Sequence, residues 1–471
     1  MSRPTTLGEL RSSGWESVPV AQEVRRNAVE RIRAGESLVE SVLGYEDTVL
    51  PQLENALLAG HDVIFLGERG QAKTRIIRSL TQLLDEWMPI VAGSEINDDP
   101  YAPVSAHGRN TVAEHGDATP IGWVHRDQRY GEKLATPDTS IADLIGEVDP
   151  IKVAEGRYLS DELTLHYGLV PRTNRGIFAM NELPDLAERI QVGLLNVLEE
   201  RDVQIRGYKV RLPLDVMLFA SANPEDYTNR GRIITPLKDR FGSQIRTHYP
   251  LDVETEMSIV SQEAVLPPSE LVDVRVPEFM LEIVSELSQQ ARESNQINQR
   301  SGVSVRLSVS NYEAIVANAV RRTLVAGDHV AVPRVSDLSA IAATTSGKIE
   351  VEAFEDGGEG RVIDALVRSA VHTVFIDTVE PTLHGPIVEA FEQGVAVDVG
   401  ADMATEHYQR LLEQVPPIRA AVDALLSRDE IDAEHPAVVA SAIELILEGL
   451  HLGKRLNKNV HGGATQYRGR S

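Results

Sequence analysis

The spacing of apolar residues changes character about halfway along the chain. In the first half, short runs of consecutive apolar residues stand between polar stretches, which is typical of strands buried on both faces of a parallel sheet. The clearest runs are 63–66, 177–180 and 216–220. After about Pro250 the apolar residues recur at helical spacing and predict helices over 253–265, 277–293, 304–322 and 335–349. The pattern therefore predicts an α/β domain followed by helical regions.

A loop that contains two glycines follows the first apolar run, and it leads to Lys73-Thr74 and a predicted helix. This order is the P-loop arrangement, in which backbone N–H groups at a helix N-terminus bind a phosphate chain. In such a loop Lys73 reaches the outer phosphates and the Thr74 hydroxyl binds Mg²⁺. The candidate ATP-binding residues are Gly67, Glu68, Arg69, Gly70, Gln71, Ala72, Lys73, Thr74 and Arg75.

One residue of this loop departs from the P-loop pattern. Ala72 stands where the pattern has a glycine. A β-carbon disfavours positive φ, so we expect Ala72 to have a helical φ. An ordinary strand–turn–helix connection is the alternative interpretation of this stretch.

The second apolar run ends on Asn181 and Glu182. Ligands of open α/β sheets bind at the carboxyl ends of the strands, where P-loop ATPases normally have Asp-Glu. The aspartate holds the water shell of Mg²⁺, and the glutamate polarises the attacking water. Asn181 can still accept a hydrogen bond from a metal-bound water but has no charge, so we expect weaker Mg²⁺ binding and slower turnover. The alternative is a buried strand that ends in a polar turn.

Three further residues are candidate catalytic groups. Asn223 follows the third apolar run and could hold the lytic water, although Ser-Ala-Asn-Pro by itself is usually a turn. Arg240 could stabilise phosphoryl-transfer charge in a neighbouring subunit; a surface ion pair is the alternative, and Arg230 and Arg232 compete for the role. Arg306, at the start of a predicted helix, could point back at the nucleotide.

The order of these stretches resembles the AAA+ ATPases of the magnesium-chelatase ATPase subunit and MoxR group. The resemblance runs from about Val42 to Ser346 and is most specific in 146–178 and 191–207. The second of these segments resembles the helix and β-hairpin that the family places before its sensor strand. By itself it predicts a helix followed by a hairpin that turns at Arg206-Gly207.

The resemblance implies a P-loop AAA+ core with a helical lid, and it assigns a family role to each candidate residue. These roles are phosphate and Mg²⁺ binding for Lys73 and Thr74, water activation for Glu182, sensor 1 for Asn223, the trans arginine finger for Arg240 and sensor 2 for Arg306. It also implies a homo-oligomeric ring, in this family a hexamer, with ATP at each subunit interface. The sequence shows no von Willebrand-type metal-binding domain, so a partner of that kind would be a separate protein.

The 471 residues are enough for about three domains of ~150 residues each. We expect a helical lead-in over 1–45, the α/β nucleotide-binding domain over 46–250 with an insertion near 89–170, and a helical lid over 251–350. A C-terminal all-α region over 351–453 and a disordered basic tail over 454–471 complete the division. The polar segment 89–135 is predicted to be exposed, and 352–360 is an acidic, glycine-rich linker.

Charge and composition narrow the range of partners and compartments. A formal net charge of −25 disfavours nucleic acid as the main partner. The chain has no cysteine, which excludes disulfides and thiolate metal sites and fits a cytoplasmic protein. No apolar run approaches the ~18 residues of a membrane span, and the N-terminal residues do not have the pattern of a secretion signal.

Three classes of function are compatible with these observations. The first is ATP-driven remodelling of a partner, either as a MoxR-like chaperone or as a chelatase-like motor for metal insertion into a tetrapyrrole; the absence of a recognisable porphyrin-binding feature favours the chaperone slightly. The second is a scaffold that binds ATP and assembles but hardly turns over, which Asn181 motivates. The third is an activator of RNA polymerase, but neither the Gly-Ala-Phe-Thr-Gly-Ala loop nor a helix-turn-helix of that class is found in the sequence.

Overall fold

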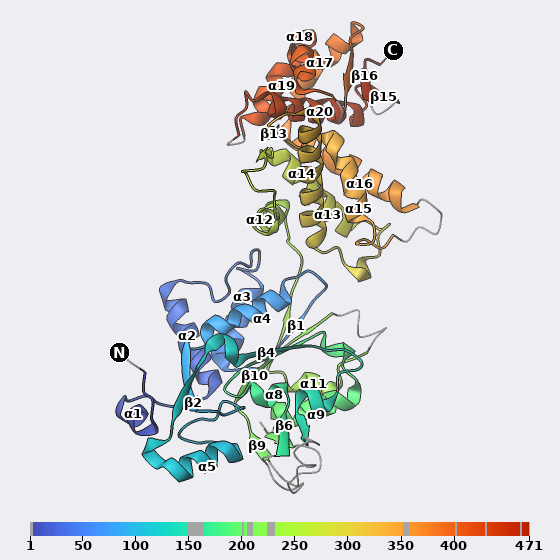
Figure 1. Cartoon of the computed structure of the whole chain (residues 1–471). Helices are drawn as coiled ribbons and strands as arrows, with labels where there is room; N and C mark the ends of the chain where they lie inside the picture. Colours follow the sequence, from blue (N-terminus) through green and yellow to red (C-terminus); the bar gives the residue numbers. More distant parts are fainter. Residues whose placement is uncertain are drawn as a thin grey trace. The chain divides into compact units, whose positions relative to one another are not determined.

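The computed structural model describes residues 3–148, 164–199, 202–204, 211–223, 231–351, 358–400, 403–428, 431–461 and 464–470. The chain forms two compact units, Met1–His248 and Tyr249–Ser471, and Figure 1 shows the elements of each. The first unit contains the predicted P-loop, and the second contains the predicted lid and everything after it.

A five-stranded parallel sheet is the centre of the first unit. In spatial order its strands are β11 (Ser243–Arg246), β1 (Val63–Leu66), β10 (Val216–Ala222), β7 (Gly176–Asn181) and β4 (Tyr130–Leu134). All four neighbouring pairs are parallel, so the carboxyl ends of all five strands lie along one edge. The three apolar runs of the sequence are β1, β7 and β10, which confirms the predicted sheet.

Helices cover both faces of this sheet. Val63 and Phe65 of β1 belong to a core with α2 (Val20–Ala34), α3 (Val49–Ala59) and α4 (Lys73–Ser79). Ile64 and Leu66 belong to a second core with α9 (Glu188–Glu199) and α11 (Thr235–Arg240). Figure 1 shows the two groups of helices on opposite sides of the strands. Because successive side chains of a strand point to opposite faces, burial on both faces requires the continuous apolar run seen in the sequence.

Smaller elements complete the first unit. They are α1 (Leu7–Ser12), η1 (Leu80–Leu83), β2 (Trp87–Val91), α5 (Ala106–His115), η2 (Gly116–Ala118), β3 (Ile121–His125), η3 (Arg126–Arg129), α6 (Ile141–Leu144), β5 (Gly146–Val148), β6 (Leu165–Tyr167), α8 (Leu169–Arg172), η5 (Leu183–Asp185), β8 (Asp202–Gln204) and β9 (Arg211–Pro213). β8 and β9 pair in antiparallel fashion, as the predicted hairpin requires, while its turn lies outside the described residues.

The loop between β1 and α4 corrects one expectation from the sequence. Ala72 has φ 53° and ψ 11°, which is the left-handed region, and not the helical φ that its β-carbon favours. The chain has to reverse its backbone at this residue to pass from the loop into α4, as the glycine of the P-loop pattern does. Left-handed geometry costs a residue with a β-carbon about 1–2 kcal/mol, so the surrounding structure holds Ala72 under strain.

The polar segment 89–135 is only in part the exposed insertion that its composition predicts, because α5 and η2 are largely exposed whereas its strands join the fold. It begins within β2, which pairs with β3 in antiparallel fashion, and it ends with β4 of the central sheet. Asp98 and Arg129 within it are fully buried. β4 lies at an edge of the sheet and its side chains are mostly half-buried. An edge strand with polar side chains has no apolar run by which the sequence could reveal it.

A buried ion pair ties the N-terminal helix α2 to this sheet. The Arg129 guanidinium donates to both carboxylate oxygens of Glu23, at 2.7 and 2.6 Å, and its Nε donates to the Arg175 carbonyl at 2.8 Å. The two side chains are 1% and 6% exposed. Glu23 also accepts from the Asp85 N–H at 2.6 Å. Within the predicted lead-in over 1–45, the helix α2 is therefore packed into the core of the first unit.

The second unit is mainly helical, as predicted. Its elements are α12 (Val253–Glu263), β12 (Asp273–Val274), α13 (Glu278–Glu293), η6 (Gln299–Ser301), α14 (Arg306–Ala326), β13 (Val330–Ala331), η7 (Val335–Ile341), α15 (Ala342–Thr345), α16 (Gly358–Thr378), α17 (Pro381–Glu392), β14 (Ala396–Val399), α18 (Thr405–Gln414), α19 (Pro417–Leu426), α20 (Pro436–Leu452), β15 (Asn457–His461) and β16 (Ala464–Arg468). The first three predicted helices are α12, α13 and α14, whereas the fourth is the 3₁₀ helix η7 followed by the short α15.

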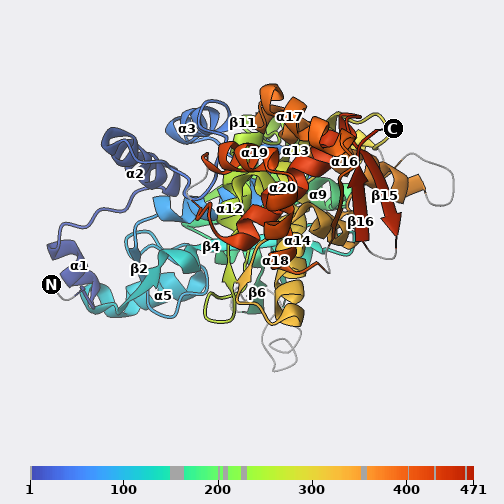
Figure 2. The ribbon, with the colours of Figure 1, turned by 90° about the horizontal axis from the view of Figure 1, so that it is seen from above.

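One hydrophobic core runs through the whole second unit. It contains residues from Val260 to Tyr467, so the predicted lid and the predicted C-terminal region pack together. α20 is buried on all sides and contacts α16, α18 and α19, among which Figure 2 shows it. Residues 352–357 of the predicted linker lie outside the described residues. Within the described residues, no helix has the length and apolar character needed to cross a membrane.

The described residues of the basic tail include two strands, contrary to the disorder expected from its composition. β15 and β16 form a hairpin, and β16 also pairs with β14, so a three-stranded antiparallel sheet accompanies the helices. The tail is anchored at Glu448 of α20, whose carboxylate accepts from the Tyr467 hydroxyl and from Lys458 Nζ. Tyr467 is 3% exposed. A buried tyrosine and a paired lysine stabilise a segment whose composition is otherwise that of a solvated chain.

We predict that Arg129→Met destabilises the first unit by about 3–5 kcal/mol, because it leaves the Glu23 carboxylate buried without its cation. The double variant Glu23→Leu/Arg129→Met should recover most of this loss, since it removes both charges. Urea unfolding followed by tryptophan fluorescence measures both effects, because all three tryptophans of the chain, Trp15, Trp87 and Trp123, lie in the first unit. Equal destabilisation by the single and double variants would contradict this account.

We predict that Ala72→Gly stabilises the first unit by about 1 kcal/mol, because glycine adopts the left-handed region without the cost of a β-carbon. Ala113→Gly, on the exposed face of α5, is the matched control and should destabilise by about 1 kcal/mol, as glycine does in a helix interior. The same unfolding experiment measures both. If the two substitutions shift stability in the same direction, Ala72 does not have a left-handed conformation in solution.

Candidate nucleotide-binding site

The loop over 67–72 is tightly packed at its beginning. A β-carbon on Gly67 would lie 1.9 Å from Thr247 Oγ1 and 2.2 Å from Gln71 Oε1, so only glycine fits. Gln71 Oε1 accepts from the Glu68 N–H at 2.9 Å and from the Thr247 hydroxyl at 2.7 Å. The Tyr45 hydroxyl donates to the Gln71 carbonyl at 3.0 Å. These contacts, made by the side chains of Gln71, Thr247 and Tyr45, stabilise one conformation of the loop.

Lys73 is the first residue of α4 and lies over this loop. Its Nζ donates to the carbonyls of Gly67 and Glu68, both at 2.6 Å, and the residue is 7% exposed. A buried ammonium is stable only where acceptors or anions surround it. The sequence places a cation at this position, and the structure brings its ammonium group against the carbonyls of the loop.

Thr74 reaches the strand that carries the second motif. Its hydroxyl donates to Asn181 Oδ1 at 3.4 Å, and the Ser221 hydroxyl donates to the same oxygen at 3.2 Å. Ser221 also accepts from the Glu182 N–H at 3.2 Å. Residues of α4, β7 and β10, far apart in the sequence, therefore meet at one carbonyl oxygen. Ser221 was not among the predicted residues, although its position two residues before Asn223 is compatible with this role.

A carboxylate on the neighbouring strand completes this group, and sequence analysis missed it. Glu132 Oε1 of β4 accepts from Asn181 Nδ2 at 2.7 Å. Arg78, one turn after Thr74 on α4, donates to both oxygens of Glu132 at 2.7 and 2.9 Å, and this pairing holds the pKa of Glu132 below its usual value. No motif contains Glu132, because it lies in the edge strand that the sequence does not reveal.

Glu182 and Asn223 lie at the same edge of the sheet. Glu182 directly follows β7 and has φ 53° in the left-handed region. Asn223 directly follows β10 and is 1% exposed. The Gly67 N–H donates to the Ala222 carbonyl at 3.1 Å, so the backbone that leads to Asn223 is bonded to the first residue of the loop. The structure thus brings together the P-loop, Asn181, Glu182 and Asn223, as the sequence predicts.

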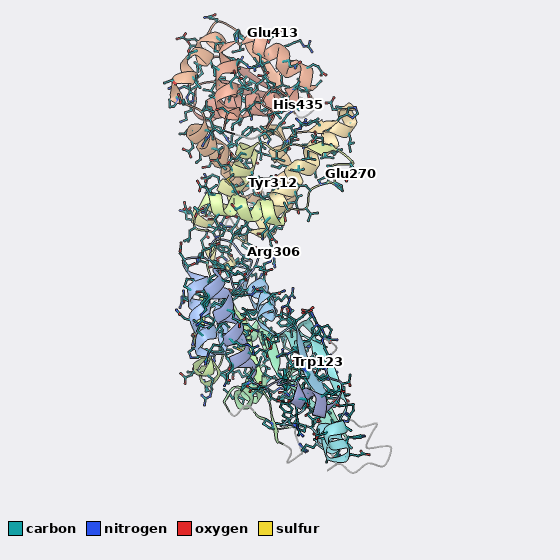
Figure 3. The ribbon with its side chains drawn as sticks, turned by 90° about the vertical axis from the view of Figure 1, so that its left-hand side faces the viewer. Trp123, Glu270, Arg306, Tyr312, Glu413 and His435 are labelled. Atoms are coloured by element: carbon teal, nitrogen blue, oxygen red, sulfur yellow. The ribbon has the colours of Figure 1, made fainter. Side chains whose placement is uncertain are left out.

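The candidate arginines lie on other elements of the structure. Arg240 ends α11, is partly exposed and donates to the Pro236 carbonyl at 3.2 Å. Arg232 is exposed and pairs with Glu188 at 3.3 Å, and Arg230 lies outside the described residues. Arg306 begins α14 in the second unit, where it is exposed; Figure 3 labels it. The finger and sensor 2 roles of Arg240 and Arg306 stay predictions.

The donor set fits a nucleotide with a magnesium ion. Mg²⁺ takes oxygen ligands and keeps several waters, and the oxygens that converge here are the Thr74 hydroxyl and the Asn181 amide oxygen. The Lys73 ammonium and the loop N–H groups suit the phosphates. Burial of this group beside a parallel sheet edge is the arrangement by which P-loop proteins bind nucleotides.

The chain is similar to several known proteins. The family model described as "Sigma-54 interaction domain" matches residues 154–240. The chain is 26% identical over 277 residues to "Magnesium-chelatase subunit ChlI, chloroplastic" of Chlamydomonas reinhardtii, an alignment that covers 54% of this chain and 63% of that protein. It is 27% identical over 212 residues to "Magnesium-chelatase 38 kDa subunit" of Cereibacter sphaeroides, covering 42% of this chain and 55% of that one.

A solved structure of the magnesium-chelatase BchI and BchD complex also aligns with this chain, at 21% identity and a TM-score of 0.35 over 69% of this chain and 98% of that one. The chain spans less than two thirds of the length of the two curated relatives above. The chain is therefore related to subunits of magnesium chelatase, as the resemblance of its motifs predicts.

Proposed function

We propose that this chain binds ATP with Mg²⁺ at the carboxyl edge of its parallel sheet and hydrolyses it to drive a change in a partner protein. The observation that carries the proposal is the contact between the P-loop and the second motif, in which Thr74 Oγ1 lies 3.4 Å from Asn181 Oδ1. The two motifs are more than a hundred residues apart in the sequence. A P-loop enzyme needs both of them beside the nucleotide.

In this scheme the chain's own residues divide the work as follows. The loop and Lys73 bind the phosphates, and Mg²⁺ held at Thr74 and Asn181 would neutralise charge on them. Glu182 orients a water whose oxygen attacks the γ-phosphorus, and the bond to the β–γ bridging oxygen breaks. ADP leaves with that electron pair, and the water proton passes through Glu182 to the phosphate product. Asn223 holds the water in line with the breaking bond.

A ring of subunits would complete each site. Arg240 would then face the nucleotide of the next subunit and stabilise the charge on the transferring phosphoryl group. The curated relatives are named as subunits of magnesium chelatase, so a chelatase-like motor is one version of the partner scheme. A MoxR-like chaperone for another protein is the second version, and in either case the partner would be a separate protein, with a von Willebrand-type metal-binding domain as the expected form.

A second candidate function rests on Asn181. Since the amide has no charge, the site could bind ATP and promote assembly with very slow turnover. The match of residues 154–240 to the sigma-54 interaction domain does not favour the polymerase activator further, because the loop typical of that class is missing from the sequence.

We predict Mg²⁺-dependent release of phosphate from ATP, with a loss of roughly 100-fold in Lys73→Ala because a charged phosphate donor is removed. Glu182→Gln should lose turnover by a similar factor but keep nucleotide binding. Arg33→Ala, an exposed cation on α2, is the control and should behave like the unaltered protein. An unchanged rate in Lys73→Ala would refute the scheme. Tight ATP binding without measurable turnover in the unaltered protein would favour the scaffold.

We predict that Arg240→Ala and Glu182→Gln are each inactive but regain activity when mixed. In mixed rings some sites combine an intact Glu182 with the Arg240 of the neighbouring subunit, so phosphate release should rise several-fold above the sum of the separate variants. Arg232→Ala mixed with Glu182→Gln is the control, and there the activity should equal the sum of the separate variants. Failure of the first mixture to gain activity, with assembly shown by light scattering, would exclude Arg240 as the trans finger.

A further inference from the structure

The environment of Asn181 decides which way its amide points. Its Nδ2 lies 2.7 Å from the Glu132 carboxylate, and its Oδ1 lies 3.2 and 3.4 Å from the hydroxyls of Ser221 and Thr74. A carboxylate can only accept, so only the NH₂ end of the amide can face it. Glu132 therefore turns the carbonyl oxygen of Asn181 toward Thr74 and the nucleotide side.

Glu132 is itself held in place. Arg78 binds both of its oxygens, and the Tyr130 hydroxyl donates to Oε2 at 3.0 Å. Thr74 and Arg78 are four residues apart on α4, so they lie on one face of the helix. Thr74 contacts the residue on β7, and Arg78 contacts the residue on the neighbouring strand β4. The helix of the P-loop is thus bonded to both strands along a single row of side chains.

The negative charge of this row of side chains lies one strand away from its usual position in P-loop ATPases. P-loop ATPases carry the acid at the position of Asn181, whereas here the acid is on β4 and the amide is on β7. The Glu132 side chain is 21% exposed, so this acid is partly open to solvent. An aspartate at 181 would put two carboxylates within hydrogen-bonding distance of each other, and like charges so close repel strongly.

We infer that Glu132 is a positioning residue of this site, which orients Asn181 so that its amide oxygen and the Thr74 hydroxyl together receive the hydrated divalent cation of the bound nucleotide. The inference rests on the proposed function. Asn181 and Glu132 act as a matched pair. The amide of Asn181 and the carboxylate of Glu132 together take the place of the aspartate that P-loop ATPases usually have. Partners that orient metal-binding groups are worth 10–100-fold in metal affinity.

Titration with Mg²⁺ tests this inference without relying on turnover. The full chain is mixed with the fluorescent nucleotide N-methylanthraniloyl-ATP, first in excess EDTA and then with increasing Mg²⁺. In Glu132→Ala the Mg²⁺ concentration for half-maximal binding should rise at least about 10-fold, while binding in EDTA stays unchanged. Glu114→Gln, which removes an exposed carboxylate from α5, should change neither value. Equal weakening with and without Mg²⁺ would mean that Glu132 only stabilises the fold, and would overturn the inference.

A swap of the two side chains is the sharper test. Asn181→Asp alone should require more Mg²⁺ than the unaltered protein, because its new carboxylate faces Glu132, and Glu132→Gln alone should also require more. The double variant Glu132→Gln/Asn181→Asp reverses donor and acceptor but keeps one hydrogen bond and one charge, so it should return to within about threefold of the unaltered protein, a coupling that a double-mutant cycle measures.

The outcomes separate this inference from the proposed function. Tighter Mg²⁺ binding in Asn181→Asp alone, or additive effects in the double variant, would overturn the matched pair while leaving ATP binding in place. An unaltered protein that fails to bind N-methylanthraniloyl-ATP under any condition would overturn the proposed function and this inference together.

Discussion

Because β1, β10 and β7 pair in parallel and in register, three strand ends that are far apart in the sequence meet along one edge. β1 brings the loop, β10 brings Ser221 and Asn223, and β7 brings Asn181 and Glu182. The bonds from Thr74 and Ser221 to Asn181 exist only if this register is kept. The arrangement of the site therefore depends on parallel pairing, which is typical of strands buried on both faces.

The same region holds features that oppose stability. Ala72 and Glu182 both have left-handed backbone conformations without being glycine, and Glu23 and Arg129 are charged groups inside the core. Strain of this kind persists only where many neighbouring contacts determine the conformation, and it is frequently found at functional sites. Here the strained residues flank Lys73 and Asn181, so the packing of α2, α3 and α4 on the sheet maintains the geometry on which binding would depend.

The contact between Glu132 and Asn181 changes the interpretation of the missing aspartate. From the sequence, Asn181 is a simple loss of charge that weakens Mg²⁺ binding. In the structure a carboxylate bonds the amide nitrogen from the next strand. A substituted residue of a motif can therefore have a compensating partner that lies outside every motif. That partner is identified only once the structure shows which strands are neighbours.

The sequence by itself determined the elements that have a strong local signal. Continuous apolar runs identified β1, β7 and β10, the glycine loop with Lys73-Thr74 identified the candidate phosphate site, and helical spacing identified α12, α13 and α14. These signals are local because burial on both faces, a loop conformation and a helix face each require particular residues at short spacing.

Only the tertiary structure decided the features that arise from contact between distant segments. The edge strand β4 is polar, so the pattern predicted an exposed insertion there; the tail is basic, so composition predicted disorder, whereas Tyr467 and Lys458 bind Glu448. The left-handed Ala72 likewise contradicts its own local preference. In each case the local signal is overridden by contacts with residues distant in the sequence or by the path of the surrounding chain. Such contacts cannot be inferred from one sequence alone.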